Sequence, residues 1–401
     1  MAHSSYDRMI GVLVATYVVL TPFVWSFLFQ AGSVLVRPTD LIAVTLFGLV
    51  ILANRRLGMP SRVLMCVLLA YLAALALSCI AQGGIMTPVL KAGAVSVAML
   101  ALTVGLRRLW VPAWMPLLPL ALLVLANPAL LVHLAESIER FASGNIRSAL
   151  FTFWNELFRM NLFGGVGLDV RGQSGRNAFA MGTVAIVLFS LLHVRPGAGR
   201  TLLIAVFVGL TVISFSRSGW LALAVLAALN LRSLRAWTML GAAAAVALFL
   251  SADWIEAFDQ RFSSNIGRLE DYPYAFEMFA KNLWFGDISI ETHGGGAVVH
   301  NVPLHLAVNF GLFVGVIALA IFLFCLLTFA WFAARSLLGG DLRDAVLATA
   351  AFVCALRMNV SAVDVNIFSM GEMVCFAMVV AGLSASRAAT AGALPGRALP
   401  A

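Results

Sequence analysis

The sequence predicts an all-α polytopic membrane protein with about twelve transmembrane helices. Three observations lead to this fold class: 62% of the 401 residues are hydrophobic, only 11% are charged, and the apolar residues gather in long runs between short polar segments. An average soluble domain has about a quarter charged residues. A chain this apolar cannot cover a water-facing surface, so we expect lipid to surround it.

Each predicted span is an apolar run of roughly 20 residues. The runs begin near Met9, Asp40, Val63, Val89, Ala113, Asn177, Thr201, Gly219, Trp237, Asn301, Asp344 and Val365. The seventh and eighth are short and form a tight pair around the sequence SFSRSG. The first run, from about Met9 to Phe29, lacks the small-residue cleavage site of a signal peptide, so we expect it to remain as a span.

Basic residues give the predicted orientation. Fourteen of the 26 Lys and Arg residues fall on the side that holds both termini. The short loops of the other side hold only four, which are Arg37, Lys91, Arg217 and Arg357. By the positive-inside rule both termini are cytoplasmic, and the two long loops, Leu134–Arg176 and Asp253–His300, face outward.

The predicted organisation follows from these runs and loops. It consists of N-terminal spans (1–133), a first outer loop (134–176), central spans (177–252), a second outer loop (253–300), C-terminal spans (301–385) and a disordered cytoplasmic tail (386–401). Apolar residues recur at helical spacing from Ile138 to Phe158 in the first loop. This pattern predicts an amphipathic helix in the headgroup layer, or a helix packed on the outer rim of the bundle.

Two classes of binding site are not supported by the sequence. The formal charge of +8 does not indicate nucleic-acid binding, because the basic residues lie in small clusters between apolar runs. The five cysteines all fall inside apolar runs and have no metal-ligand spacing, so we expect small hydrophobic side chains in helices, no metal and no cofactor.

Three stretches place polar groups where apolar ones would be easier to accommodate. The first is SFSRSGW, from Ser214 to Trp220. Arg217 lies there between two short apolar runs, and a buried guanidinium is costly unless it is paired or hydrated. The flanking serines indicate a wet, hydrogen-bonding pocket; the alternative is an arginine that reaches the outer headgroups.

The second stretch runs from Arg261 to Asp287. We expect a helix that begins at Arg268, carries Tyr272, Ala275, Phe276 and Phe279 on one side, and ends at Trp284-Phe285-Gly286. An arginine one turn before an aromatic face can reach over a cavity. Alternatively, Arg261 and Arg268 pair with Glu270 and Asp271 on a solvated loop, where ion pairs contribute little.

The third stretch is HGGGAVVHNVPLHL, from His293 to Leu306. Asn301 fits a helix N-cap, because its side-chain oxygen can accept a hydrogen bond from a backbone N–H that the first turn leaves unpaired. This role does not explain His300. His293 and His305 are alternative functional histidines in the same stretch.

Taken together, these stretches resemble the bacterial O-antigen ligase and polymerase family. The matching segments are RGQSGRNAFA, SFSRSGW, Arg268 with NLWFG, His300-Asn301 and NFGLFVG, in that order, between about Arg171 and Ile321. Individually the motifs are short; their order, spacing and side of the membrane make the resemblance specific. The family usually has Trp and Pro where this chain has Tyr272 and Leu283 or Trp284.

The resemblance implies a metal-independent inverting glycosyltransferase of the bacterial inner membrane. Its donor would be an undecaprenyl-diphosphate-linked oligosaccharide, and its acceptor a hydroxyl group on the periplasmic face. Arg217 and Arg268 would hold the diphosphate, and His300 would accept the proton of the acceptor hydroxyl. Arg171, Arg176, Arg261 and Asn301 would add contacts to phosphate or sugar.

Two acceptors and one other class of protein remain open. In a polymerase of surface polysaccharide or exopolysaccharide, the acceptor is another lipid-linked repeat unit. In a ligase it is lipid A–core. A transporter of lipid-linked sugar is the alternative from another class; it would place ionisable groups near the membrane midplane, where Glu372 is the one acid predicted inside a span.

Overall fold

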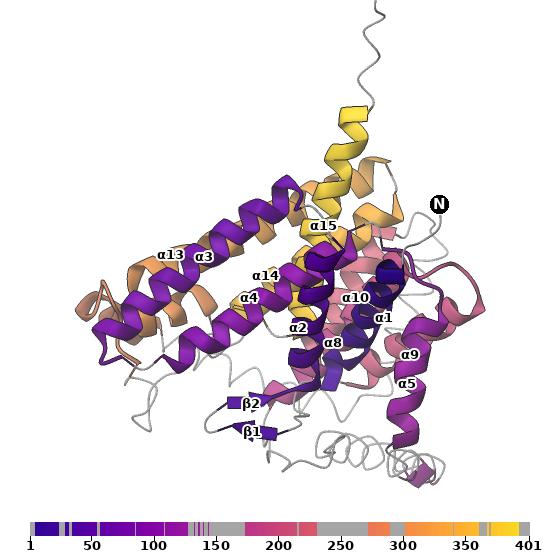
Figure 1. Cartoon of the computed structure of the whole chain (residues 1–401), viewed down its shortest axis with the longest axis horizontal. Helices are drawn as coiled ribbons and strands as arrows, with labels where there is room; N and C mark the ends of the chain where they lie inside the picture. Colours follow the sequence, from indigo (N-terminus) through magenta and orange to yellow (C-terminus); the bar gives the residue numbers. More distant parts are fainter. Residues whose placement is uncertain are drawn as a thin grey trace, which may run out of the picture. The chain divides into compact units, whose positions relative to one another are not determined.

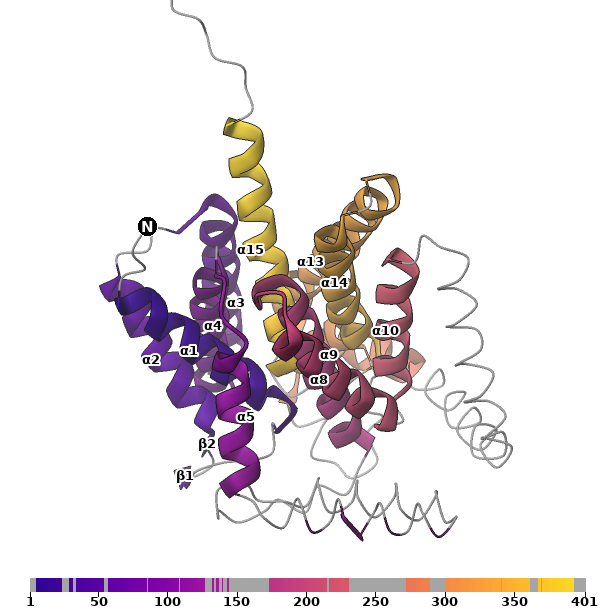
Figure 2. The ribbon, with the colours of Figure 1, turned by 90° about the vertical axis from the view of Figure 1, so that its right-hand side faces the viewer.

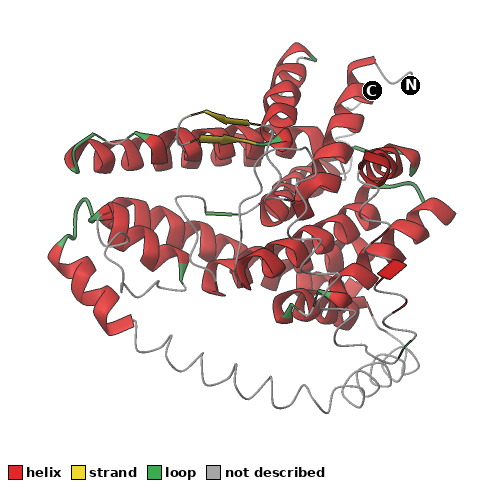
Figure 3. Cartoon of the chain, turned by 90° about the horizontal axis from the view of Figure 1, so that it is seen from below, coloured by secondary structure: helices red, strands yellow, loops and turns green. Residues whose placement is uncertain are grey.

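The computed structural model describes residues 5–23, 29–31, 34–53, 57–84, 86–107, 109–126, 132, 135–136, 139, 143, 173–214, 216–230, 272–288, 301–339, 341–360, 367–368 and 370–392. Most of these residues are helical (Figure 3). The chain divides into two compact units. The first comprises Met1–Leu69, Lys91–Leu223 and Phe368–Ala401, and the second comprises Ala70–Leu90 and Ala224–Ile367.

Helices build both units. The first holds α1 (Ser5–Leu20), α2 (Pro38–Leu52), α5 (Trp114–Ala126), α8 (Gln173–His193), α9 (Ala198–Ile213) and α15 (Met370–Gly392). The second holds α13 (Val302–Gly339), α14 (Leu342–Val360) and a short helix at 272–281. Three helices contribute residues to both units: α3 (Met59–Ala81), α4 (Thr87–Leu106) and α10 (Arg217–Asn230).

A helix lies in eleven of the predicted apolar runs, and the run near Trp237 lies outside the described residues. Within the described residues, three helices are long and apolar enough to cross a membrane: α3, α4 and α13. Several others are shorter than predicted, with α5 only 13 residues long. The chain is therefore a helical protein with membrane-spanning character.

The first predicted span is too long. Helix α1 ends at Leu20, and a 3-10 turn, η1 (Thr21–Phe23), follows it. Pro22 explains the end, because proline has no N–H to donate to a helix and disfavours helical conformation in the residue before it. Phe29, the predicted end of the span, lies instead in strand β1 (Phe29–Ala31).

The described residues are mainly helical, as predicted, and include one short strand pair that the sequence did not predict. β1 pairs antiparallel with β2 (Val34–Val36), with Phe29 opposite Val36, just before α2 begins (Figure 1). The paired segments are only three residues each, and an apolar run this short does not distinguish a strand from a helix end in the sequence.

Helix α8 forms the centre of the first unit. It packs on α9, beside which it lies in Figure 2, and on α15 and η1. Two glycines permit this close packing. A Cβ on Gly182 would lie 2.6 Å from the Pro22 nitrogen, and one on Gly371 would lie 2.7 Å from the Gly182 nitrogen. Three segments that are distant in sequence therefore meet backbone to backbone.

In the second unit, α13 lies alongside α14 (Figure 2). The buried face of α13 repeats at helical spacing and contains Val314, Ala318, Ile321, Cys325, Thr328, Phe332 and Ser336. Near its end, Arg335 pairs with the buried Asp344 of α14 at 3.0 Å. The cysteines behave as predicted: all five are free thiols within helices, and all except Cys66 are buried.

Substitution of Gly182 tests the packing in the first unit. Gly182→Ala is expected to lower the thermal unfolding midpoint of the purified protein, because overpacking against backbone costs about 1–3 kcal/mol. Gly209 in α9 has no atom within 4 Å of an added Cβ, so Gly209→Ala is the matched control. Its midpoint should stay the same or rise, since alanine is the better helix former. Equal midpoints for the two variants would contradict this packing.

Candidate functional site

The structure describes three of the seven predicted site residues. His300, Arg268, Arg261 and Arg171 lie outside the described residues. Arg176 belongs to the first turn of α8, although its side chain is not described. Arg217 is the first residue of α10, and Asn301 directly precedes α13. Arg217 belongs to the first unit and Asn301 to the second.

Asn301 is a helix N-cap, as predicted. Its side-chain Oδ1 accepts a hydrogen bond from the Leu304 N–H at 3.0 Å, and its carbonyl oxygen accepts one from His305 N–H at 2.8 Å. The cap satisfies one of the backbone donors that the first turn leaves unpaired. It also fixes the point at which the segment carrying His300 enters the helix.

Helix α13 is not a single continuous span, because it breaks at Gly311. This residue has φ 83° and ψ −179°, a backbone conformation that is essentially restricted to glycine. A Cβ on Gly315 would lie 2.5 Å from the Ala307 Cβ, whereas residues eight apart in a continuous helix are about 12 Å apart. The chain therefore folds back at Gly311, and the short helix 302–310 packs against the start of the long one.

At the break, two other hydrogen bonds replace the helical bond between the Leu312 N–H and the Val308 carbonyl. In a continuous helix the Leu312 N–H would donate to the Val308 carbonyl. Here the Leu312 N–H donates to the Leu283 carbonyl at 2.8 Å, and the Val308 carbonyl accepts from the Asp287 N–H at 3.0 Å. Both new partners come from the turn 282–288, which follows the helix 272–281.

This turn lies against the break at backbone distance. A Cβ on Gly286 would lie 2.4 Å from the Phe310 nitrogen, and one on Gly311 would lie 2.5 Å from the Trp284 carbonyl carbon. Gly286 also has a positive φ of 69°. We call this contact between 283–288 and 308–312 the glycine junction. Both glycines lie in segments that resemble family motifs, NLWFG and NFGLFVG, and the structure places these two segments in contact.

Polar side chains at the end of α3 bind the glycine junction. The Gln82 amide nitrogen donates to the Phe285 carbonyl at 2.5 Å and to the Asn309 carbonyl at 2.9 Å. It therefore contacts both segments of the junction, 283–288 and 308–312. The Gln82 Oε1 accepts from the Ile288 N–H at 2.8 Å. Ser78, one turn earlier, donates to the same Phe285 carbonyl at 2.6 Å. Sequence reasoning missed both residues.

A buried polar pair lies inside the short helix 302–310. His305 and Asn309 are both buried, and the Asn309 amide nitrogen lies 3.2 Å from His305 Nε2. Sequence analysis considered His305 only as a rival to His300. His305 is therefore an interior residue of the short helix, bonded to a side chain one turn later.

The helix predicted to follow Arg268 is present, but one of its residues faces the other way. In helix 272–281, Tyr272, Ala275 and Phe279 pack on Val308 of the short helix, in a cluster that also includes Met278 and Leu304. Phe276 was predicted to share this face and is instead 58% exposed. It points outward because it follows Ala275 by one residue, which is about 100° of helical rotation.

Arg217 lies on a tightly built turn. Ser216 is the N-cap of α10, with its Oγ accepting from the Gly219 N–H at 3.3 Å, and Ser214 Oγ donates to the Thr211 carbonyl at 2.6 Å. Both serines are buried and bonded to backbone, so helix capping explains their polarity without a hydrated pocket. Arg217 itself is exposed. Since a helix N-terminus carries a partial positive charge, the guanidinium strengthens a positive potential that favours anions.

The first outer loop was predicted to carry an interfacial helix, and nearly all of it lies outside the described residues. One described feature is a backbone hydrogen bond of 2.9 Å from the Ser143 N–H to the Glu139 carbonyl. Within the described part of the chain, no group of three or more His, Cys, Asp and Glu residues is placed to hold a metal ion.

No protein-family model matches the chain, and the comparison with curated proteins gives no match. Two described features bear on the possible chemistry of this protein. One is the glycine junction, which ends at Ile288, together with the Asn301 cap; Ile288 and Asn301 are the described residues on either side of 289–300. The other is the exposed guanidinium of Arg217 on a rigid helix start.

The glycine junction predicts that Gly311 tolerates no side chain. Gly311→Ala is expected to lower the thermal unfolding midpoint, because the φ alone costs about 1–3 kcal/mol and the Cβ would collide with Trp284. Gly93 in α4 has nothing within 4 Å of an added Cβ, so Gly93→Ala should not lower the midpoint. A Gly311→Ala protein as stable as the Gly93→Ala protein would show that α13 does not break there.

Gln82 is predicted to hold the junction closed. Gln82→Met keeps the approximate size of the side chain but leaves the partly buried Asn309 carbonyl and Ile288 N–H without this partner, which costs at most about 1–3 kcal/mol for each group. Hydrogen exchange should become faster at 283–288 and 308–312 and stay unchanged in α8. Ser96→Ala is the control, because Ser96 bonds only within its own helix, to the Ala92 carbonyl. Unchanged exchange at the junction would refute the role of Gln82.

Proposed function

We propose that this protein is a membrane glycosyltransferase of the O-antigen ligase and polymerase family, located in the bacterial inner membrane with both termini in the cytoplasm. It would transfer a glycan from an undecaprenyl-diphosphate donor to an acceptor hydroxyl on the periplasmic face. The first candidate activity is polymerisation of an O-antigen-type surface polysaccharide or exopolysaccharide.

The observation that carries this proposal is that the described residues on either side of the 289–300 segment are both held by hydrogen bonds. Ile288, the residue before the segment, donates its N–H to Gln82, and Asn301, the residue after it, caps the short helix. A general base must be held close to the hydroxyl it deprotonates. Fixed ends on both sides of the segment support the assignment of this role to His300.

The proposed reaction is a direct displacement. The acceptor oxygen forms a bond to the anomeric carbon, the bond from that carbon to the diphosphate oxygen breaks, and His300 takes the hydroxyl proton. Inversion at the anomeric carbon follows from a single displacement. Arg217 and Arg268 would bind the departing diphosphate, since a guanidinium remains charged and donates two parallel hydrogen bonds to phosphate oxygens.

Four further residues have supporting roles in this proposal. Arg171, Arg176 and Arg261 would contact phosphate or sugar. Asn301 was predicted to do the same, but its Oδ1 already accepts the Leu304 N–H. Its contribution in this proposal is therefore to fix the start of the helix beside His300. The exposed Arg217 at the positive end of α10 is the described residue best suited to an anionic ligand.

The acceptor separates two forms of this proposal. In the polymerase form it is a second lipid-linked repeat, and in the ligase form it is lipid A–core. The polymer profile of a strain lacking the protein distinguishes them. Loss of the ladder with single repeats retained supports a polymerase, whereas bare core supports a ligase.

A transporter of lipid-linked sugar is the second candidate, because α13 is discontinuous. Broken helices with polar groups beside the break are typical of transporter sites, and His305 and Asn309 precede Gly311. Glu372, which was predicted inside a span, is buried in the first turn of α15. A carboxylate there is favoured by the helix dipole and does not by itself indicate transport.

Transfer by purified protein in liposomes, with a labelled lipid-linked oligosaccharide, tests the proposal. His300→Ala is expected to reduce the rate by about 10²–10⁴-fold, the usual contribution of a general base. Arg217→Ala should also reduce it strongly, and Arg217→Lys should recover only part, because lysine lacks the two-pronged fork. Arg195 is an exposed arginine of the same unit, so Arg195→Ala should keep full activity.

Each other outcome has a defined meaning. Full activity of the His300→Ala protein would remove the base assignment. Equal losses for Arg217→Ala and Arg195→Ala would show that Arg217 acts only through net charge. Movement of the lipid-linked sugar across the liposome membrane without any transfer product would replace the enzyme with the transporter.

A further inference from the structure

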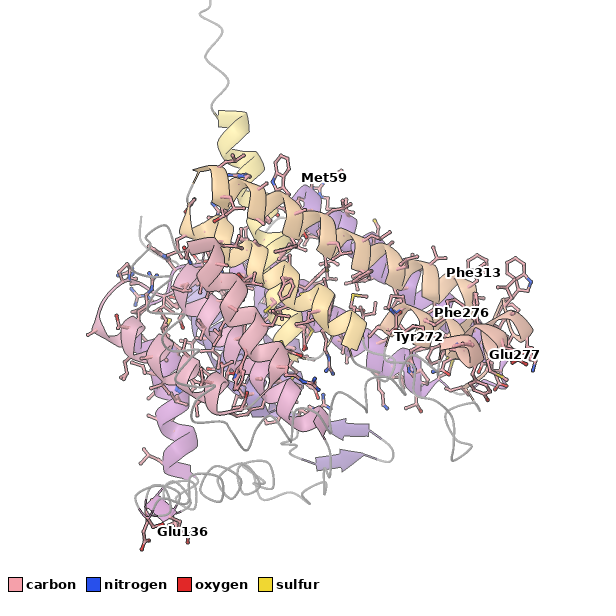
Figure 4. The ribbon with its side chains drawn as sticks, turned by 180° about the vertical axis from the view of Figure 1, so that it is seen from behind. Met59, Glu136, Tyr272, Phe276, Glu277 and Phe313 are labelled. Carbon is pink, nitrogen blue, oxygen red and sulfur yellow. The ribbon has the colours of Figure 1, made fainter. Side chains whose placement is uncertain are left out.

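Five aromatic side chains near the glycine junction are exposed on the protein. They are Tyr274 and Phe276 of helix 272–281, Trp284 and Phe285 of the following turn, and Phe313 of α13. Trp284 and Phe313 contact each other, with ring centroids 6.0 Å apart. Figure 4 shows Phe276, Glu277 and Phe313 at the same end of the second unit as Tyr272.

This aromatic cluster continues into an apolar stripe along α13. Leading away from Phe313, the exposed residues of that helix include Val316, Leu319, Leu323, Leu326, Leu327 and Trp331. Apart from the adjacent Leu326 and Leu327, they follow one another at three or four residues, which places them on one side of the helix, opposite the buried face. The side chain at one end of the stripe is Phe313 and that at the other end is Trp331, both more than half exposed.

The length of this stripe matches a bilayer. Trp331 follows Phe313 by 18 residues, which is about 27 Å of helix. The hydrocarbon core of a bilayer is about 30 Å thick. No charged residue lies between Phe313 and Trp331, and charge resumes four residues after Trp331 at Arg335.

Charge also resumes beside the aromatic cluster. Lys281 and Glu277 form an exposed ion pair at 2.8 Å on helix 272–281. Their hydrogen bond lowers the pKa of the Glu277 carboxyl and raises the pKa of the Lys281 ammonium, so both are charged at neutral pH. Aromatic rings next to a charged pair fit the boundary between acyl chains and headgroups, where Trp and Tyr gather in membrane proteins.

We propose that the aromatic cluster is an interfacial anchor that inserts into the phospholipid bilayer, with the hydrocarbon core spanning Phe313 to Trp331. Helix 272–281 then lies in the headgroup layer, and the glycine junction lies at the same depth, since Trp284, Phe285 and Phe313 belong to or adjoin it. The depth assignment does not depend on the proposed glycosyltransferase.

Quenching of tryptophan fluorescence by brominated lipids tests the depth. The full chain is reconstituted in phosphatidylcholine vesicles whose acyl chains are brominated either near the headgroup or near the terminal methyl. The fluorescence lost in the Trp284→Phe variant, relative to the parent protein, is the signal of Trp284. The Trp331→Phe variant gives the signal of Trp331, at the other end of the apolar stripe, in the same way. Both signals should be lost mainly with the shallow bromines.

Two results would overturn the proposal. One is a Trp284 signal that aqueous iodide quenches and neither lipid does. The other is stronger quenching of Trp284 by the deep bromines than by the shallow ones.

Spin labels provide a second measurement that leaves Trp284 in place. Cysteines are introduced singly at Phe276, Phe313 and Leu323 in a Cys66→Ser chain, since the four remaining cysteines are buried. Accessibility to oxygen relative to a water-soluble nickel complex should be highest at Leu323, intermediate at Phe313 and lowest at Phe276. A label at Lys281 is the headgroup-side control. Equal depth for the Leu323 and Phe276 labels would reject the anchor.

Discussion

The described fold depends on how the backbone N–H and carbonyl groups at the break in α13 find hydrogen-bond partners. A buried backbone N–H or carbonyl needs a hydrogen-bond partner, so a helix can break inside the protein only where other groups replace the lost bonds. At Gly311 the replacements come from one turn, because Leu283 and Asp287 take over the partners of the missing Leu312–Val308 bond. Gln82 then satisfies the Asn309 carbonyl from α3. The break, the turn and the end of α3 are therefore mutually dependent.

Glycine makes this arrangement possible at two places for different reasons. Gly311 is needed for its conformation and for its contact with the Trp284 backbone, whereas Gly315 is needed because the chain folds back and brings Ala307 against it. A side chain at either position would push apart the short helix and the start of the long one. The same pair of glycines supports the family resemblance, since both belong to the motif NFGLFVG. A structural requirement is thus sufficient to explain that motif, and any chemistry must be sought in the segment that the junction holds.

Two described segments that carry proposed site residues are each held rigidly. The turn that carries Arg217 is fixed by two buried serines, and the start of α13 is fixed by the Asn301 cap. The serines had indicated a hydrated pocket in the sequence, but their hydroxyls are bonded to backbone. Sequence cannot distinguish these cases, because a serine that caps a helix and a serine that lines a pocket have the same local pattern. The aromatic cluster beside the junction would bring the junction to the depth at which lipid phosphates lie.

The sequence by itself determined the helical, membrane-type composition, the approximate start of eleven helices and the cap at Asn301, because each follows from local periodicity or from a side chain and its own turn. Only the tertiary structure decided where α13 breaks, that Phe276 faces outward, and that Ser78 and Gln82 hold the junction. These features depend on contacts between residues that are distant in sequence, 21 and 29 positions apart at the break and 203 in the Gln82–Phe285 bond. Such contacts leave no local periodicity, since a polar residue at a helix end fits a solvated turn equally well.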